Sequence, residues 1–229
     1  CVIRTNVCKY DGGGLLNCGG GIEDCAISGN RVTGAAYGGG LASCLGTIRN
    51  CTVVGNRAFD GGGLASCGTI TNCIVWNNRP TGGSYQQVRL PGAVSYCDVQ
   101  DGSAGPGCIT AAPQFVNEGL WNGTTWQEGD YHLQAASPCV DTGDPAFTSE
   151  GMDIEGNPRI VNGRVDMGAY ERDPSGGSLP DFDGDGIPDR TDPDMDNDGV
   201  ANEADVCDFT PAGAAVQGNG TLRADADGA

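Results

Sequence analysis

Large and basic side chains are scarce in this chain of 229 residues. It has three tryptophans, six tyrosines, five phenylalanines and one histidine, and only 12 lysines and arginines against 30 acidic residues. So few aromatic residues argue against a compact two-layer core of large side chains. The formal net charge of −18 argues against nucleic acid or an anionic membrane as a partner. No membrane-spanning run or signal peptide is visible.

Groups suited to catalysis are also few. The acids of the first hundred residues do not recur at a fixed spacing: Asp11, Glu23, Asp24, Asp60 and Asp98. Polysaccharide lyases and hydrolases need clustered carboxylates, or a base beside calcium, on one face. His132 is the single histidine and Lys9 the single lysine, so no Ser/His/Asp set or zinc set can be assembled. We expect no catalytic residues, a structural role for His132, and no enzymatic activity.

The chain instead contains a repeated motif: a cysteine, an aliphatic residue two positions later and an asparagine five positions later. Four copies begin at Cys1, Cys25, Cys51 and Cys73, with their asparagines at Asn6, Asn30, Asn56 and Asn78. A fifth, eroded copy begins at Cys97 and keeps Val99. The cysteines are 24, 26, 22 and 24 residues apart. A period in the twenties with β-type alternation is typical of a solenoid.

A second motif, Gly-Gly-Gly-Leu, occurs once in each of three periods and starts at Gly12, Gly38 and Gly61. Together with an isoleucine three residues before each cysteine, it divides one turn into three short strands. The cysteine and the aliphatic residue should both point inward, because strand side chains alternate. Each asparagine should lie at a bend and bond the asparagines above and below it. Arg31, Arg57 and Arg79 follow these asparagines directly and should point to solvent.

The 12 cysteines fall mostly on repeat positions, which affects their chemistry. Stacked turns lie about 4.8 Å apart, a Cα spacing that a disulfide allows. Cysteine also packs well as a small apolar residue. We expect mostly free thiols inside the coil, with disulfides between neighbouring turns as the alternative.

These two alternating motifs resemble the repeats of polymorphic outer-membrane proteins. Those repeats carry Gly-Gly-Ala-Ile/Leu and Phe-x-x-Asn, where this chain has Gly-Gly-Gly-Leu and Ile/Val-x-x-Asn. The resemblance covers about residues 1–100. It implies an all-β fold, a right-handed parallel β-helix. We therefore assign residues 1–112 to the turns of a β-helix.

A different unit follows in residues 113–172, with motifs at 113–116, 130–133, 137–144, 153–159 and 163–171. Their order is similar to the C-terminal end of bacterial surface β-helix proteins of the choice-of-anchor Q type. Such a unit should act as a terminal cap, because an open last turn exposes unpaired strand edges. Asp141, Asp144, Asp153 and Asp166 within it should cap turns. Residues 173–180 are rich in glycine, serine and proline and are interpreted as a linker.

The acidic tail contains two consecutive twelve-residue segments with oxygen ligands at alternate positions and glycine at the sixth, the spacing of a calcium loop. The backbone carbonyls of Ile187 and Val200 fill the seventh positions. The predicted metal ligands are Asp181, Asp183, Asp185, Ile187, Asp189, Asp192, Asp194, Asp196, Asp198, Val200, Asn202 and Asp205. The alternative is a disordered acidic tail, because such runs repel themselves.

Both loops end in aspartate, and no amphipathic helix flanks them, so they are not an EF-hand pair. They resemble thrombospondin type 3 repeats, Asp-x-Asp-x-Asp-Gly-x-x-Asp, and end in Asp205-Val-Cys207. The resemblance implies a truncated calcium-binding region over residues 181–229 that holds two Ca²⁺ ions. Without metal the adjacent carboxylates should repel, so bound calcium should rigidify the segment.

Together these features predict a non-enzymatic, structural or adhesive protein of a bacterial cell surface or the extracellular space. It would be a β-helical rod with a cap and an irregular, calcium-stiffened tail. One alternative is a filament subunit that assembles end to end through open strand edges. Another is a polysaccharide lyase, a hydrolase or a glycan-binding module. Calcium is the expected ion, and glycans or cell-surface components are possible partners.

Overall fold

A computed structural model describes residues 1–82, 87–102, 105–148, 151–172 and 199–200. The chain divides into two compact units, Cys1–Arg172 and Asp173–Ala229. The described part of the second unit is Gly199 and Val200. The first unit is built from β-strands, and its described residues include one short 3-10 helix, η1 (Pro145–Phe147).

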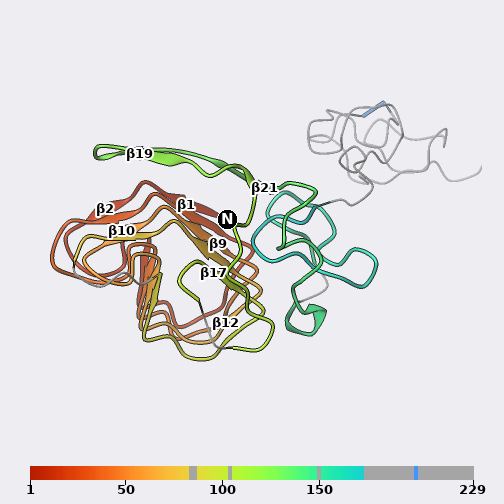
Figure 1. Ribbon diagram of the computed structural model, residues 1–229, viewed down its shortest axis with the longest axis horizontal. Coiled ribbons are helices and arrows are strands. Elements are labelled where there is room, and N and C mark those ends of the chain that lie inside the picture. Colours follow the sequence, from red (N-terminus) through yellow and green to blue (C-terminus); the bar gives the residue numbers. More distant parts are fainter. Residues whose placement is uncertain (83–86, 103–104, 149–150, 173–198, 201–229) are drawn as a thin grey trace, which may run out of the picture. The chain divides into compact units, whose positions relative to one another are not determined.

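The predicted parallel β-solenoid is confirmed, with about four turns (Figure 1). Four parallel sheets run along the stack, and each turn adds one strand to each of them. The five-stranded sheet holds β1 (Val2–Arg4), β5 (Ala26–Ser28), β9 (Thr52–Val54), β13 (Ile74–Trp76) and β17 (Asp98–Val99).

The other three sheets of the coil have four strands each. The first contains β2 (Val7–Cys8), β6 (Arg31–Val32), β10 (Arg57–Ala58) and β14 (Arg79–Pro80). The second contains β3 (Leu15–Leu16), β7 (Leu41–Ala42), β11 (Leu64–Ala65) and β15 (Val88–Arg89). The third contains β4 (Ile22–Glu23), β8 (Ile48–Arg49), β12 (Ile70–Thr71) and β16 (Val94–Ser95).

The prediction of three strands per turn was wrong, because each turn contains four. The additional strand comes directly after the asparagine, and it includes the arginine in every turn but the first, where Val7 takes that position. Arg57 is paired in register with Arg31 and Arg79, and the next residue, Ala58, is fully buried. A strand of two residues gives no alternation that a sequence pattern could reveal.

Inward side chains form columns along the stack. Ile27 pairs in register with Val53, and Val53 with Val75. All three are completely buried in one apolar cluster that also contains the cysteines of the repeat from Cys25 onward. Cys1 departs from this pattern, because it is exposed.

The triple glycines are required by backbone packing between neighbouring turns. Gly38 has a φ of +67°, a conformation that side chains rarely adopt. A Cβ on Gly39 would lie 2.3 Å from the Gly62 carbonyl oxygen and 2.6 Å from the Arg57 nitrogen. The turns can therefore stack at this corner only if the middle residue has no side chain.

Residues 113–172 pack against the outward face of the five-stranded sheet. They contain two antiparallel pairs, β18 (Phe115–Asn117) with β21 (Asp130–Leu133) and β19 (Leu120–Asn122) with β20 (Thr125–Gln127). A second apolar cluster joins the two parts, with Val54 and Ile74 from the coil and Trp126 and Met167 from the later segment. These contacts lie on the side of the stack, and a capping role for residues 113–172 stays a prediction.

Candidate functional site

The asparagines of the repeat form a hydrogen-bonded ladder along one corner of the coil. Asn56 Oδ1 accepts bonds of 2.9 Å from both the backbone N–H and the side-chain amide of Asn30. Asn56 in turn donates from the same two groups to Asn78 Oδ1, again at 2.9 Å. Its amide also donates to the Ile27 carbonyl at 2.8 Å. The ladder thus satisfies backbone groups that the bend removes from the sheets.

The ladder ends on a glutamine that sequence reasoning missed. Gln87 Oε1 accepts bonds from the backbone N–H and the side-chain amide of Asn78, both at 2.9 Å, and Gln87 Nε2 donates to the Asn78 carbonyl at 2.8 Å. The glutamine side chain therefore replaces the next asparagine. It comes from a different position in the turn, so the repeat spacing gave no signal for it.

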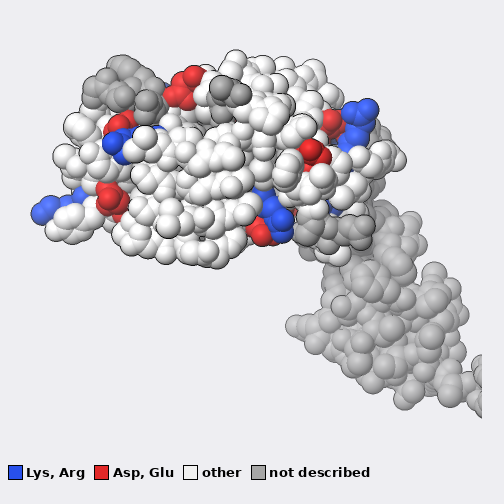
Figure 2. Space-filling view, turned by 90° about the horizontal axis from the view of Figure 1, so that it is seen from below, with Lys and Arg blue, Asp and Glu red and all other residues white. Residues whose placement is uncertain are grey.

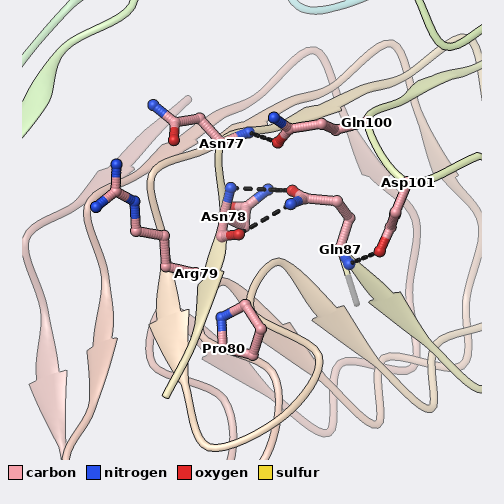
Figure 3. Close-up of a pocket in the computed structure, with 7 residues that line it drawn as sticks. All are labelled: Asn77, Asn78, Arg79, Pro80, Gln87, Gln100 and Asp101. Carbon is pink, nitrogen blue, oxygen red and sulfur yellow. Dashed lines mark hydrogen bonds between the residues drawn. The ribbon is translucent and has the colours of Figure 1, made fainter. Parts of the chain in front are cut away.

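A polar pocket of about 500 Å³ lies where the ladder ends (Figure 3). The backbone N–H of Asn77 donates to Gln100 Oε1 at 2.7 Å, and that of Gln87 donates to Asp101 Oδ2 at 2.6 Å. Side-chain amides and a carboxylate therefore lie around one small hollow, and Figure 3 shows the Arg79 guanidinium on the side of Asn78 away from Gln87 and Asp101. The lining residues are Asn77, Asn78, Arg79, Pro80, Gln87, Gln100 and Asp101.

The cysteines that the structure describes are free thiols, as the sequence favoured, while Cys207 lies outside the described residues. Within the coil the backbone N–H of Cys51 donates to Cys73 Sγ at 3.4 Å, and that of Cys73 to Cys97 Sγ at 3.3 Å. Burial raises the pKa of the Cys51 and Cys73 thiols well above the ordinary value. These groups are therefore protonated and serve as packing, not as nucleophiles.

The predicted turn-capping role of the aspartates in residues 113–172 is confirmed for Asp144, Asp153 and Asp166. Asp144 Oδ1 accepts from the Ala146 N–H at 2.9 Å. The Asp153 carboxylate accepts from the N–H groups of residues 155, 157 and 171, and Asp166 from those of residues 141 and 172. For Asp141 the bond runs the other way, since its own N–H donates to Asp166 at 2.7 Å. Backbone N–H groups thus hold the carboxylates of Asp144, Asp153 and Asp166 in place.

His132 lies between two carboxylates. Its Nδ1 is 2.5 Å from Asp130 Oδ1, and its Nε2 is 2.8 Å from Glu155 Oε2. Burial disfavours the charged ring, but the hydrogen bonds to the two carboxylates outweigh this and raise the His132 pKa above 6.5. The ring joins β21 to the segment after it, an arrangement consistent with the structural role predicted for it.

Arg159 is a buried link between the coil and residues 113–172 that sequence reasoning did not single out. It is 1 % exposed, and its guanidinium donates to the Gly168 carbonyl. Its Nε lies 3.5 Å from Asp24 Oδ1, and its Nη1 lies 3.7 Å from Glu171 Oε2. The Arg159 guanidinium thereby joins Asp24 of the coil to Gly168 and Glu171 of the later segment.

Asp98 is a buried carboxylate on the outward face of the five-stranded sheet. Its Oδ2 accepts a bond from the Cys139 thiol at 3.2 Å, and its Oδ1 has no partner among the described residues. Burial raises the Asp98 pKa to about 7, although the Cys139 hydrogen bond opposes the shift. Burial likewise raises the pKa of Asp166 to about 6 and of Glu171 to about 8.

These raised pKa values predict a stability that decreases from acid to neutral pH. The pKa of such a carboxyl is about 4 in the unfolded chain and higher in the folded chain. Below about pH 4 the group contributes its full stabilisation to the folded state. That stabilisation is lost as the pH rises through the folded-state pKa. We expect the free energy of unfolding, measured in urea, to fall between pH 5 and pH 8. The Asp98→Asn variant should show a fall smaller by about 1–3 kcal/mol. An equally steep fall in this variant would contradict the assignment to Asp98.

The predicted calcium ligands lie outside the described residues, except for Val200: Asp181, Asp183, Asp185, Ile187, Asp189, Asp192, Asp194, Asp196, Asp198, Asn202 and Asp205. In the described ranges no group of three or more His, Cys, Asp or Glu side chains is placed to hold a metal ion. A search of the same ranges for helices found none with the length and apolar character needed to cross a membrane.

The described residues thus offer two features that could serve a function: a stack held by internal ladders and a polar pocket at the end of one ladder. Neither contains a recognised set of catalytic groups. Comparison of the chain with models of protein families, with curated proteins and with solved structures found no match.

Proposed function

We propose that this chain is a non-enzymatic structural part of an extracellular or cell-surface protein. In this proposal residues 1–112 form a right-handed rod, residues 113–172 protect it, and residues 181–229 bind calcium. The observation that carries the proposal is the asparagine ladder, in which Asn30, Asn56 and Asn78 bond one another along the stack. A repeat that uses its recurring polar residue for bonding along the stack is suited to stiffness.

The interior supports the same proposal. The buried columns consist of aliphatic residues and protonated thiols from successive turns, so that each turn buries the face of its neighbour. The outward face of the five-stranded sheet is covered by Trp126, which packs on Gly29 and Gly55. The side of the rod is thereby reinforced by a segment distant in sequence.

The calcium part of the proposal is tested by calorimetry on the complete chain. We expect two Ca²⁺ ions to bind, with dissociation constants below about 1 mM, the range of extracellular calcium modules. Heat release should be accompanied by a smaller hydrodynamic radius, since bound ions remove repulsion among the tail carboxylates. Chelation with EDTA should reverse both changes.

A matched pair of variants makes this test specific. Asp185→Asn and Asp198→Asn each remove one carboxylate from one predicted loop, and each should lower the number of strongly bound ions from two to one. Asp60→Asn is the control, because Asp60 lies in the coil and pairs with Arg89 at 2.9 Å. Absence of calcium binding at millimolar concentration would refute the calcium-stiffened tail.

A further inference from the structure

Three arginines occupy the same position on successive turns of the coil. Arg31, Arg57 and Arg79 are register partners on β6, β10 and β14. Neighbouring strands of a sheet lie about 4.8 Å apart, so the row places three positive charges within roughly 10 Å. The residue after each arginine faces the other way, as the burial of Val32 and Ala58 shows. The guanidinium groups therefore share the outer face, where like charges in register are unfavourable.

The row is unusual because two other arginines of the coil form ion pairs with acidic residues of a neighbouring turn. Arg49 meets its register partner Glu23 at 2.7 Å, and Arg89 meets Asp60 at 2.9 Å. No ion pair involves Arg31, Arg57 or Arg79 in the part of the chain that the structure describes. The face drawn in Figure 2 is mostly white, with scattered basic and acidic groups.

The β19–β20 hairpin holds the central arginine, on β10, in place. The Arg57 guanidinium stacks 4.0 Å from the centre of the Trp121 ring, and its Nη1 donates to the Gly123 carbonyl at 3.0 Å. Trp121 Nε1 in turn donates to the Gly55 carbonyl at 2.6 Å. Partial burial, together with the charges of Arg79 and Arg31, lowers the Arg57 pKa. The side chain is thus fixed in orientation by the Trp121 ring and the Gly123 carbonyl. No carboxylate among the described residues forms an ion pair with it.

The exposed end of the row opens on the polar pocket. Arg79 is the exposed arginine of the row. It also lines the pocket, together with Asn77, Gln100 and Asp101. Guanidinium groups bind carboxylates and sulfates in a forked geometry. Amide and carboxylate side chains bind hydroxyl groups. A ligand that satisfies both must carry anionic groups and hydroxyl groups in one chain.

From this arrangement we propose that Arg57 and Arg79, with the adjoining pocket, bind a carboxylated or sulfated polysaccharide laid along the stack. Each turn would meet successive anionic groups of the polymer, and the pocket would receive the hydroxyl groups of a sugar beside Arg79. The net charge of the whole chain does not oppose this, because residues 1–82 contain six Lys and Arg against four Asp and Glu. The inference rests on the proposed function as part of an extracellular or cell-surface protein and gives that protein a ligand class.

The test is a binding measurement on the complete chain in calcium-containing buffer at low and physiological salt. The immobilised probes are polygalacturonate, chondroitin sulfate, neutral dextran, poly-glutamate and phosphatidylserine vesicles. We expect binding to at least one acidic polysaccharide and none to dextran. The Arg57→Gln/Arg79→Gln double variant should bind at least about tenfold more weakly, because it loses charge-assisted hydrogen bonds. Arg49→Gln, which removes one positive charge from the same coil outside the row, should bind within about twofold of the native chain.

Three results would overturn the inference. The first is no binding to either acidic polysaccharide, and the second is equal weakening of that binding by the Arg57→Gln/Arg79→Gln and Arg49→Gln variants. The third is binding of poly-glutamate or vesicles as tight as that of the acidic polysaccharides. Thermal unfolding and calcium calorimetry on the same samples separate the two proposals. Native values in both, together with any of these results, would remove the polysaccharide site and leave the proposed rod and its calcium-binding tail standing.

Discussion

The Asn56→Ala variant should unfold with a free energy about 3–5 kcal/mol lower than that of the native chain. Asn56 is completely buried, and its amide group bonds Asn30, Asn78 and the Ile27 carbonyl. Alanine would leave these buried donors and acceptors without partners, and each unsatisfied group costs about 1–3 kcal/mol. Urea denaturation measures the difference directly.

The matched control is Asn6→Ala at the exposed beginning of the same ladder. Asn6 donates to Asn30 Oδ1 at 2.9 Å, but water can replace its bonds. We expect this variant to lose no more than about 1 kcal/mol. Similar losses for the two variants would show that the ladder does not contribute through burial.

The Gly39→Ala variant should be destabilised by at least about 3 kcal/mol or fail to fold. The added Cβ would lie 2.3 Å from the Gly62 carbonyl oxygen and 2.6 Å from the Arg57 nitrogen. Both are backbone atoms, so no side-chain rotation can relieve the contact, and two turns would have to separate. Thermal unfolding followed by circular dichroism reports the loss.

Gly19→Ala provides the control for this substitution. A Cβ at Gly19 meets no atom within 4 Å, so this variant should stay within about 0.5 kcal/mol of the native chain. If the Gly19→Ala and Gly39→Ala variants unfolded at the same temperature, close stacking of turns at the glycine corner would be excluded as the reason for the triple glycines.

The coil could be predicted from the sequence because its columns repeat the same residue type. Cysteine, valine or isoleucine, and asparagine recur at one spacing, and this pattern alone indicates stacked turns. The strand at Arg57–Ala58 was missed because two residues carry no periodicity. Gln87 was missed because it replaces an asparagine from another point of the turn, which only the folded chain reveals.

The packing of residues 113–172 on the side of the coil had a signal that was overlooked. The segments Thr52–Val54 and Ile74–Trp76 are nearly continuous apolar runs, which are typical of strands buried on both faces. Alternation explains only their inward residues, Val53 and Val75. The partner surface, with Trp126 and Met167, could not be inferred, because no local pattern links segments some 50–110 residues apart.

Nuclear magnetic resonance on methyl-labelled protein tests the stacking of turns most directly. If inward residues stand in columns, nuclear Overhauser effects should connect the methyl groups of Ile27 with Val53, and of Val53 with Val75. Corresponding cross-peaks should link Leu41 with Leu64 and Ile48 with Ile70. Ile27 and Val75, two turns apart, should give none. Absence of the neighbouring-turn signals, or a direct signal between Ile27 and Val75, would contradict the solenoid and everything derived from it.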